Sequence, residues 1–402
     1  MRRVDSSIRT LVLGVLCFCP FIIWAADPSS PTVNRTFALD HNRLIVEVEL
    51  LRPDGSLRKA KAWVDTGSHT LDVAETLALE LGLEIPAFPQ NGHTATSASR
   101  TPAISIGGLP LDAAGIKLQV HRGNRVMPGV PAELNLPARV LLNYFVVFDY
   151  PGQRLTVAPP GTVEPRGTLV PCRIHPDTGL FQITVPVEGE QVQMAVDNGS
   201  AGTWVSEALA NVWTARHPGW STSRGAAGST NFFGFPFELK GLLLRLPELQ
   251  IGSATVRGVG VLGLHQGLFD WYSTKTVYPV QGFLGANVLK DFRLEVDYPK
   301  QMTYWTLGRS TPEPFFQVGI TLRPLPDGRY MIAGILERAG KPCVDGAEAG
   351  DVLLRVDSLA VSNLSMGGVM KALQGKPGEF RTLHLEREGR PVKIKTKVSR
   401  LI

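Results

Sequence analysis

Cysteine is scarce in this sequence. The 402 residues include four cysteines, and two of them, Cys17 and Cys19, lie in an apolar N-terminal segment. The other two, Cys172 and Cys343, are far apart in what we interpret as different domains, and neither has a His or Cys neighbour. The histidines elsewhere lack the spacing of metal ligands. We therefore predict no disulfide, no metal site and no cofactor, so that the fold depends on its hydrophobic core.

Long charge runs and low-complexity segments are also absent. The formal net charge is +5, and the basic residues are scattered along the chain. Where they do cluster, Lys393, Lys395 and Lys397 alternate, which places them on one face of a strand. Such a row is typical of a solvated face, so we expect no nucleic-acid partner.

Beyond the N-terminus, no apolar segment is long enough to span a membrane. The N-terminus itself has the three parts of a secretory signal, which are basic residues, an apolar run and small residues (Arg2, Arg3 and Arg9; Leu11 to Trp24; Ala25-Ala26). The apolar run is shorter than the ~20 residues of a spanning helix. We predict that residues 1–26 are a cleaved signal peptide and that the protein is periplasmic or secreted, with no transmembrane segment in the mature chain. Retention of the run as an N-terminal anchor is the alternative.

Glycine and proline, in contrast, are plentiful, with 41 and 30 residues. This composition favours many short strands and turns over long helices. The chain is also too long for one compact core, which indicates two or three domains. The sequence therefore predicts a mainly β protein with several domains.

The order of landmarks between residues 31 and 160 returns between residues 161 and 309. Each half has strands leading into an Asp turn, then a helical stretch, an apolar-x-Ile-Gly run, an apolar-apolar run and a hairpin with Asp-Tyr-Pro. The matched pairs are 65–68 with 197–200, 73–81 with 205–213, 104–107 with 249–252, 140–143 with 282–285, and 149–151 with 297–299. Five landmarks in one order indicate an internal duplication into two lobes.

The duplicated Asp turn suits a definite chemistry. Two carboxylates that share one proton can hydrolyse a peptide bond, because one activates a water while the other donates to the carbonyl. Each carboxylate must then sit on a rigid turn that faces its twin. Asp65-Thr66-Gly67-Ser68 and Asp197-Asn198-Gly199-Ser200 supply two such turns, with Gly for the tight bend and hydroxyls for support.

Each half resembles a lobe of the retropepsin-like aspartic proteases, over about residues 31–309. The resemblance rests on the strands before the Asp turn, the Ile-x-Ile-Gly run and the closing strands. It implies that Asp65 and Asp197 form a catalytic dyad acting on a peptide or protein substrate. It also implies that Thr66 locks the two turns together and that Ser68 and Ser200 support the carboxylates. Two flaps are expected, within 91–101 and 224–235.

Two departures from that pattern leave a second hypothesis open. Asn198 stands where the family has Thr or Ser, and Asn-Gly is by itself a favoured hairpin turn. Asn143 stands where the apolar-apolar loop of the first lobe is expected to end in Gly. The alternative to an active endopeptidase is therefore a catalytically inactive peptide-binding protein that has retained the fold.

The C-terminal segment, residues 315–402, matches neither lobe and follows a linker from Ser310 to Pro314. It resembles a PDZ domain, because Ala349-Gly350-Asp351 leads into an apolar strand and residues 369–373 fit the helix beside the peptide groove. The resemblance implies that the loop Gln317-Val318-Gly319-Ile320 binds the carboxylate of a C-terminal peptide ligand. An open sheet edge would then pair with the peptide main chain.

Overall fold

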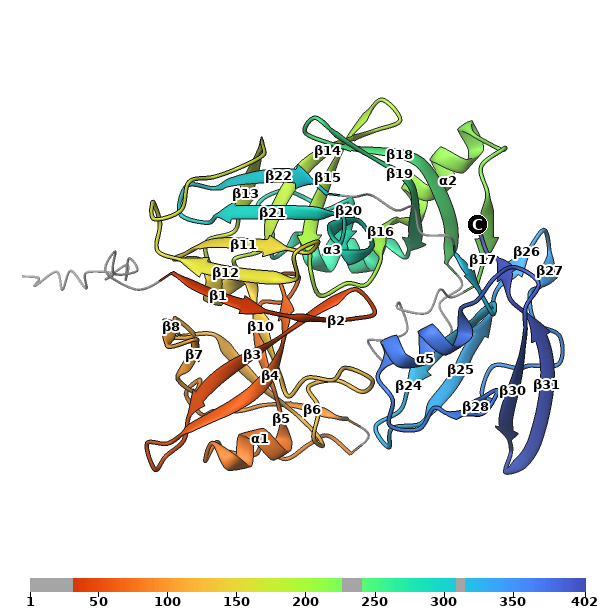
Figure 1. Cartoon of the computed structure of the whole chain (residues 1–402), viewed down its shortest axis with the longest axis horizontal. Helices are drawn as coiled ribbons and strands as arrows, with labels where there is room; N and C mark the ends of the chain where they lie inside the picture. The colour runs from red at the N-terminus through yellow and green to blue at the C-terminus, as the bar shows by residue number, and fades with distance from the viewer. Residues whose placement is uncertain (1–31, 91, 226–240, 309–314) are drawn as a thin grey trace, which may run out of the picture.

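The computed structural model describes residues 32–90, 92–225, 241–308 and 315–402. The expected signal peptide, the linker and most of the second expected flap lie outside these ranges. The described chain is mainly β and forms two lobes and a C-terminal unit (Figure 1). Within these ranges, no helix is long and apolar enough to cross a membrane.

The first lobe is built from short strands with one α-helix and one 3-10 helix. Its elements are β1 (Val33–Thr36), β2 (Ala38–Asp40), β3 (Arg43–Leu51), β4 (Leu57–Asp65), β5 (Thr70–Ala74), α1 (Glu75–Glu80), β6 (Thr94–Thr96), β7 (Ile104–Ile106), β8 (Leu109–Leu111), β9 (Lys117–His121), β10 (Leu134–Pro137), η1 (Ala138–Leu141), β11 (Phe145–Asp149) and β12 (Arg154–Ala158). The first expected flap contains only the short strand β6, at the edge of the sheet beside β9.

The second lobe repeats this plan with longer strands. Its elements are β13 (Thr168–Ile174), β14 (Phe181–Val187), β15 (Glu190–Asp197), β16 (Thr203–Ser206), α2 (Glu207–Arg216), β17 (Thr222–Arg224), β18 (Leu242–Ile251), β19 (Ala254–Leu264), α3 (Gln266–Ser273), β20 (Gly282–Gly285), α4 (Ala286–Leu289), β21 (Phe292–Asp297) and β22 (Met302–Leu307).

Strand pairing confirms the duplication. In the first lobe, β10 runs parallel to β4, which ends at Asp65, and antiparallel to β5. In the second lobe, β20 runs parallel to β15, which ends at Asp197, and antiparallel to β16. The strand after each Asp turn also pairs in parallel with a later strand, β5 with β9 and β16 with β19. The apolar-x-Ile-Gly runs are equivalent too, because Gly107 and Gly252 both open a hairpin turn at positive φ.

The same pairing corrects one expected landmark. We expected Asn143 to match Gly285, and this is wrong. Gly285 lies opposite Asp197 across the parallel pair, and the residue opposite Asp65 is Pro137. Asn143 lies further along the chain, between η1 and β11. The first lobe therefore has Pro137 at the position of Gly285, and this proline ends a strand at a φ of −71°.

The two lobes join through their closing hairpins. Strands β11 and β21 pair antiparallel, so that one continuous sheet runs in the order β1-β12-β11-β21-β22-β13 (Figure 1). Both hairpins have the same turn, in which Asp149 Oδ1 accepts from Gly152 N at 2.9 Å and Asp297 Oδ1 accepts from Lys300 N at 3.2 Å. This arrangement relates the lobes by an approximate twofold axis and places the two Asp turns at equivalent points.

Period-two alternation explains how β3 and β4 face two cores. Leu44, Val46, Val48 and Leu50 of β3 are buried in the core of the two lobes. The intervening residues lie on the opposite face, where Ile45 is paired with Trp63 of β4. Ile45 and Trp63 belong to a separate apolar cluster, which they share with the C-terminal unit.

The C-terminal unit combines one twisted sheet with one helix. Its elements are β23 (Phe316–Gln317), β24 (Ile320–Pro324), β25 (Tyr330–Ile335), β26 (Glu337–Arg338), β27 (Lys341–Pro342), β28 (Val352–Val356), β29 (Leu359–Ala360), α5 (Met366–Leu373), β30 (Phe380–Arg387), β31 (Arg390–Lys397) and β32 (Ser399–Arg400). The main sheet has the order β24-β25-β28-β30-β31. Lys393, Lys395 and Lys397 are exposed on β31, as the alternation predicted. Cys172 and Cys343 are both free.

The C-terminal unit packs against both lobes. Val126, Val130 and Ala132, from the loop before β10, belong to the apolar cluster that contains Ile45, Trp63 and the side chains around α5. On the second lobe, β17 pairs with β26, and Leu401 and Ile402 are buried against a further cluster of that lobe. Figure 1 shows this unit beside both lobes rather than apart from them.

Candidate active site

The two Asp turns have the same local geometry. Each aspartate is the last residue of its strand, and its Oδ1 accepts a hydrogen bond from the glycine two residues later. Gly67 N lies 3.1 Å from Asp65 Oδ1, and Gly199 N lies 2.8 Å from Asp197 Oδ1. Ser200 N adds a second donor to Asp197 Oδ1 at 3.1 Å. The backbone of each turn therefore holds its own carboxylate.

Each turn also packs against the carboxylate of the other turn. A Cβ on Gly67 would lie 2.5–2.7 Å from the carboxyl atoms of Asp197, and a Cβ on Gly199 would collide with the carboxyl of Asp65. Only glycine fits at either position. The two carboxyl groups therefore lie beside each other, and both aspartates are buried, with 8% and 3% of Asp65 and Asp197 exposed. The structure thus brings together the two predicted aspartates.

The surroundings of the pair keep one proton between the two carboxyls. Burial raises the pKa of Asp65 well above its usual range, and the negative charges of Asp197 and Asp72 raise it further. Burial also raises the pKa of Asp197, to about 6, although hydrogen bonds from Gly199 and Ser200 oppose this rise. Two carboxylates this close cannot both ionise readily. The pair therefore shares one proton, and the two N–H donors at Asp197 Oδ1, against one at Asp65 Oδ1, favour the negative charge on Asp197.

The two turns are locked together by Thr66. Its Oγ1 donates to Val196 O at 2.9 Å and accepts from Asn198 N at 3.0 Å, so one hydroxyl crosses to the other lobe twice. Asn198 does not make the reciprocal contact with its side chain. Its amide is fully buried, and neither Oδ1 nor Nδ2 has a hydrogen-bond partner among the described residues. Of the two reciprocal side-chain contacts expected between the turns, the one from Thr66 is therefore present and the one from residue 198 is not.

The two serines support the turns rather than the carboxylates. Ser68 Oγ donates to Thr70 O at 3.1 Å, and Ser200 Oγ donates to Gly202 O at 2.6 Å. Within the described residues, neither hydroxyl has a hydrogen bond to Asp65 or Asp197. Each serine therefore fixes the two residues that follow its turn, and Ser200 reaches the carboxylate only through its backbone N–H.

Three side chains at the site were not found from the sequence. Arg43, at the start of β3, donates from Nε to Gly199 O at 2.9 Å. Tyr272, on α3, lies close enough to both aspartates for their charges, after burial, to raise the pKa of its phenol well above 10. Asn135, on β10, is fully buried and donates to Ser68 Oγ and Thr70 O at 3.2 and 3.0 Å. The polar Asn135 within an apolar strand was the only local signal for any of them.

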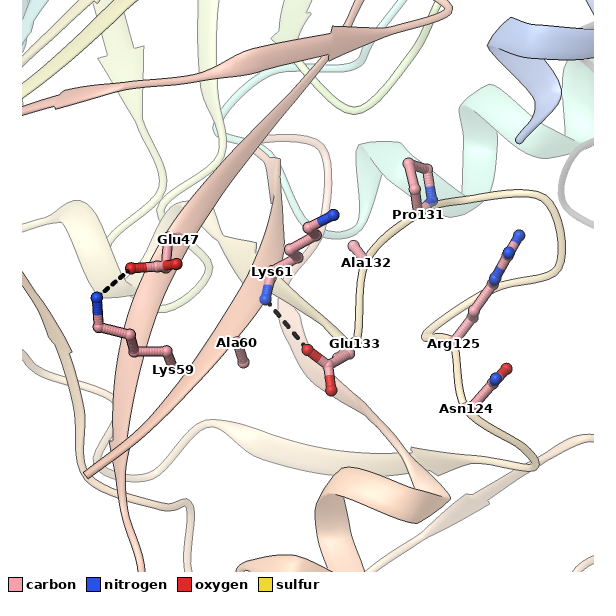
Figure 2. Close-up of a pocket in the computed structure, with 9 residues that line it drawn as sticks. All are labelled: Glu47, Lys59, Ala60, Lys61, Asn124, Arg125, Pro131, Ala132 and Glu133. Atoms are coloured by element: carbon pink, nitrogen blue, oxygen red, sulfur yellow. Dashed lines mark hydrogen bonds and ion pairs between the residues drawn. The ribbon is translucent and has the colours of Figure 1, made fainter. Parts of the chain in front are cut away.

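A hollow of about 430 Å³ lies on the same face of β3 and β4 as Ile45 and Trp63 (Figure 2). Its lining comes from these two strands and from the loop before β10, and it carries charges of both signs. Lys59 Nζ pairs with Glu47 Oε1 at 2.9 Å, and Lys61 N donates to Glu133 Oε2 at 3.3 Å. Along the strands, Trp63 separates this hollow from Asp65.

No set of residues suited to a metal ion accompanies the pair. In the part of the chain that the structure describes, no group of three or more His, Cys, Asp or Glu side chains is placed to hold one.

No protein-family profile matches the sequence, and no curated protein matches it. A crystal structure of an aspartic proteinase from Irpex lacteus is similar at a TM-score of 0.40 and 13% sequence identity, over 69% of this chain and 98% of that chain. A likeness at this level carries no weight for the function, and the two-lobed fold is defined here by its own strand pairing.

Proposed function

We propose that this protein is an aspartic-type endopeptidase of the retropepsin-like kind, with Asp65 and Asp197 as its dyad. The observation that carries the proposal is the placement of two buried carboxyls on equivalent turns, each held by its own glycine N–H and packed against the glycine of the other turn. The lobes would span residues 31–160 and 161–309, with the substrate extended between them.

The reaction follows from the unequal ionisation of the pair. Asp197, as carboxylate, accepts a proton from a water whose oxygen attacks the peptide carbonyl carbon. Asp65 donates its proton to the carbonyl oxygen, which gives a neutral tetrahedral diol. When the C–N bond breaks, the nitrogen takes a proton from Asp197, and a diol hydroxyl returns its proton to Asp65. The pair then has one proton again and is ready for the next cycle.

Incubation of the purified mature protein with a peptide library tests the proposal. We expect internal cleavage that a statine-type inhibitor blocks, because statine mimics the tetrahedral diol. Cleavage that persists with the inhibitor and in Asp65→Asn would exclude this mechanism. The control is Asp149→Asn, which changes an aspartate in a hairpin turn outside the dyad.

The missing side-chain contact of Asn198 favours one alternative, a peptide-binding protein without catalysis. Asn198 leaves a buried amide with no partner among the described residues, and such a defect loosens a turn that must hold Asp197. Peptides that bind but stay intact over prolonged incubation, with the dyad unmutated, would support this alternative.

We further propose that residues 315–402 form a PDZ domain that controls the access of substrate to the space between the two lobes. The predicted carboxylate loop lies at the C-terminal end of α5, and two of its N–H groups are already engaged. Val318 N donates to Leu373 O at 3.0 Å, and Ile320 N donates to Val318 O at 2.8 Å. A peptide carboxylate could use these two N–H groups only after their present bonds open.

The N-terminal end of α5 is held by the first lobe. Met366 N donates to Gly129 O at 2.8 Å, Gly367 N donates to Asp40 Oδ2 at 3.3 Å, and Ser365 Oγ also donates to Asp40. Trp63, two residues before Asp65, lies in the same apolar cluster as the buried side chains of α5. These contacts support control of substrate access by the C-terminal unit.

Titration with peptides that end in an apolar residue tests this control. We expect the peptides to bind and to accelerate cleavage, while the same peptides with an amidated C-terminus do neither. Equal binding of both forms would argue against carboxylate recognition.

Export is part of the same proposal. We expect the protein recovered from its producing cells to begin after Ala26, as N-terminal sequencing would show. An intact N-terminus in a membrane fraction would favour the retained anchor.

A further inference from the structure

Arg43 is a buried cation that crosses from the first lobe to the second. It is the first residue of β3, only 1% of it is exposed, and its Nε donates to Gly199 O at 2.9 Å. Gly199 belongs to the turn that carries Asp197, and 156 positions separate the two residues in sequence. Arg43 therefore ties the first lobe to the second Asp turn.

This contact is made at the turn that lacks its own lock. Thr66 crosses from the first turn to Val196 O and Asn198 N, whereas the Asn198 amide has no partner among the described residues. By the approximate twofold axis, a hydroxyl side chain at position 198 would form the equivalent hydrogen bonds to the Asp65 turn of the first lobe. The second turn instead receives its additional connection to the first lobe from Arg43.

The charge of Arg43 also acts on the dyad. Burial lowers the pKa of the Arg43 guanidinium to about 10, so it remains a cation at neutral pH, and Asp40, Asp197 and Asp65 favour that charged form. Conversely, Arg43 opposes the rise in pKa of both dyad carboxyls. His41 stays neutral beside it, because burial and then the charge of Arg43 lower its pKa to about 3.

We propose that Arg43 is a positioning residue that replaces the missing half of the lock, by holding the Asp197 turn through Gly199 O and by placing a fixed positive charge beside the dyad. This inference deepens the proposed function and rests on it for its catalytic consequence. Its structural consequence, coupling between Arg43 and Asn198, does not depend on catalysis.

A double-mutant cycle between Arg43→Gln and Asn198→Thr tests the structural consequence. We expect Arg43→Gln to lower the midpoint of thermal unfolding. In the double variant, Asn198→Thr should recover most of that loss, since Thr supplies a hydroxyl that can hydrogen-bond to the Asp65 turn. Strictly additive effects would overturn the idea that Arg43 replaces the lock. Because no peptidase assay is involved, this cycle remains decisive even if the proposed function is wrong.

Kinetics test the catalytic consequence. A turn that shifts by ~1 Å costs about a hundredfold in rate, so Arg43→Gln should lower kcat by about 10- to 100-fold with a smaller change in KM. The acidic limb of the pH–rate profile of Arg43→Gln should also move to higher pH, because the loss of a nearby cation raises the pKa of the two dyad carboxyls. The other ionisable groups facing the dyad and Arg43, which are Asp40, His41, Asp72, Tyr150 and Tyr272, are unchanged in this comparison.

Two further variants keep the test sharp. Arg43→Lys retains the charge, so we expect the acidic limb of its pH–rate profile to stay near that of the wild type. It lacks the guanidinium Nε–H that holds Gly199 O, so we expect kcat to remain reduced. Arg35→Gln, at a half-exposed arginine of β1, is the control and should change neither property. If Arg43→Gln leaves both kcat and the acidic limb unchanged in an active enzyme, the proposal is wrong.

Discussion

The Asp65 turn and the Asp197 turn are equivalent by strand pairing, yet they are held by different contacts. Thr66 at the first turn makes both hydrogen bonds of the lock, while Asn198 at the second contributes only its backbone N–H. The second turn compensates locally, because Asp197 accepts from both Gly199 N and Ser200 N, whereas Asp65 accepts from Gly67 N.

This difference shows how a duplicated site becomes asymmetric without losing its geometry. Burial raises the pKa of both aspartates and Arg43 opposes that rise at both; the additional N–H donor favours the ionised form of Asp197, while the charges of Asp197 and Asp72 disfavour it for Asp65. The two aspartates thus acquire different roles from different surroundings. Substitutions at the two turns test whether the asymmetry is functional.

The largest expected effect is the loss of peptidase activity when either aspartate becomes asparagine. Asp65→Asn removes the acid and Asp197→Asn removes the base, and general acid–base catalysis contributes about 10²–10⁴-fold for one group. We expect each variant to lose at least ~10³-fold in kcat/KM, measured with a peptide substrate. Should one of the two retain most of the activity, the shared-proton mechanism fails and the comparison of the turns has no catalytic meaning.

The next effect is on the free energy of unfolding, which should respond differently to substitutions at Thr66 and at Asn198. Thr66→Val leaves a buried carbonyl and a buried N–H unsatisfied, at Val196 and Asn198, and should reduce the free energy of unfolding by about 2–4 kcal/mol. Asn198→Leu, which keeps the shape but removes an amide without described partners, should be neutral or stabilising. Denaturant unfolding of both variants measures the contrast, and equal losses would show that the amide of Asn198 has a partner.

A third effect concerns pH. The pKa of Asp197 is about 6 in the folded protein, against an ordinary value of 3.8. The folded state therefore binds the proton more tightly, so stability is highest below about pH 4 and declines as the pH rises towards 6. Asp197→Asn should make this decline shallower, with the remainder due to Asp65, whose pKa burial also raises, and should raise the unfolding midpoint at pH 7 but not at pH 3. An identical gain at both values would show that charge is not the cause.

The sequence predicted the Asp turns, the duplication and the closing hairpins, because each depends on a local pattern. It misplaced the strand opposite Asp65, because Asn135 interrupts the apolar run of β10 and the next apolar run, Val140 to Leu142, looked like the better match. Asn135 is tolerated there because its amide hydrogen-bonds fully within the lobe, to Ser68, Thr70 and Asp72.

Arg43 could not be predicted for a different physical reason. Its contact with Gly199 joins residues 156 positions apart, and no periodicity or turn motif records such a pair. In sequence it reads as a polar residue at the start of an alternating strand. Only the pairing of the lobes brings its guanidinium to the second turn.

The smallest expected effect comes from making the two turns alike. Asn198→Thr replaces a buried amide with a hydroxyl of the size found at Thr66, so it should remove a desolvation cost and stabilise the protein by about 1 kcal/mol. Peptidase activity should stay the same or rise, because the second turn gains a contact without a change at Asp197. Thermal unfolding and kcat/KM, measured beside Thr66→Ser as the conservative control at the other turn, check both expectations. Loss of activity in a stable Asn198→Thr variant would instead assign Asn198 a role of its own, and the asymmetry of the two turns would then be required for function.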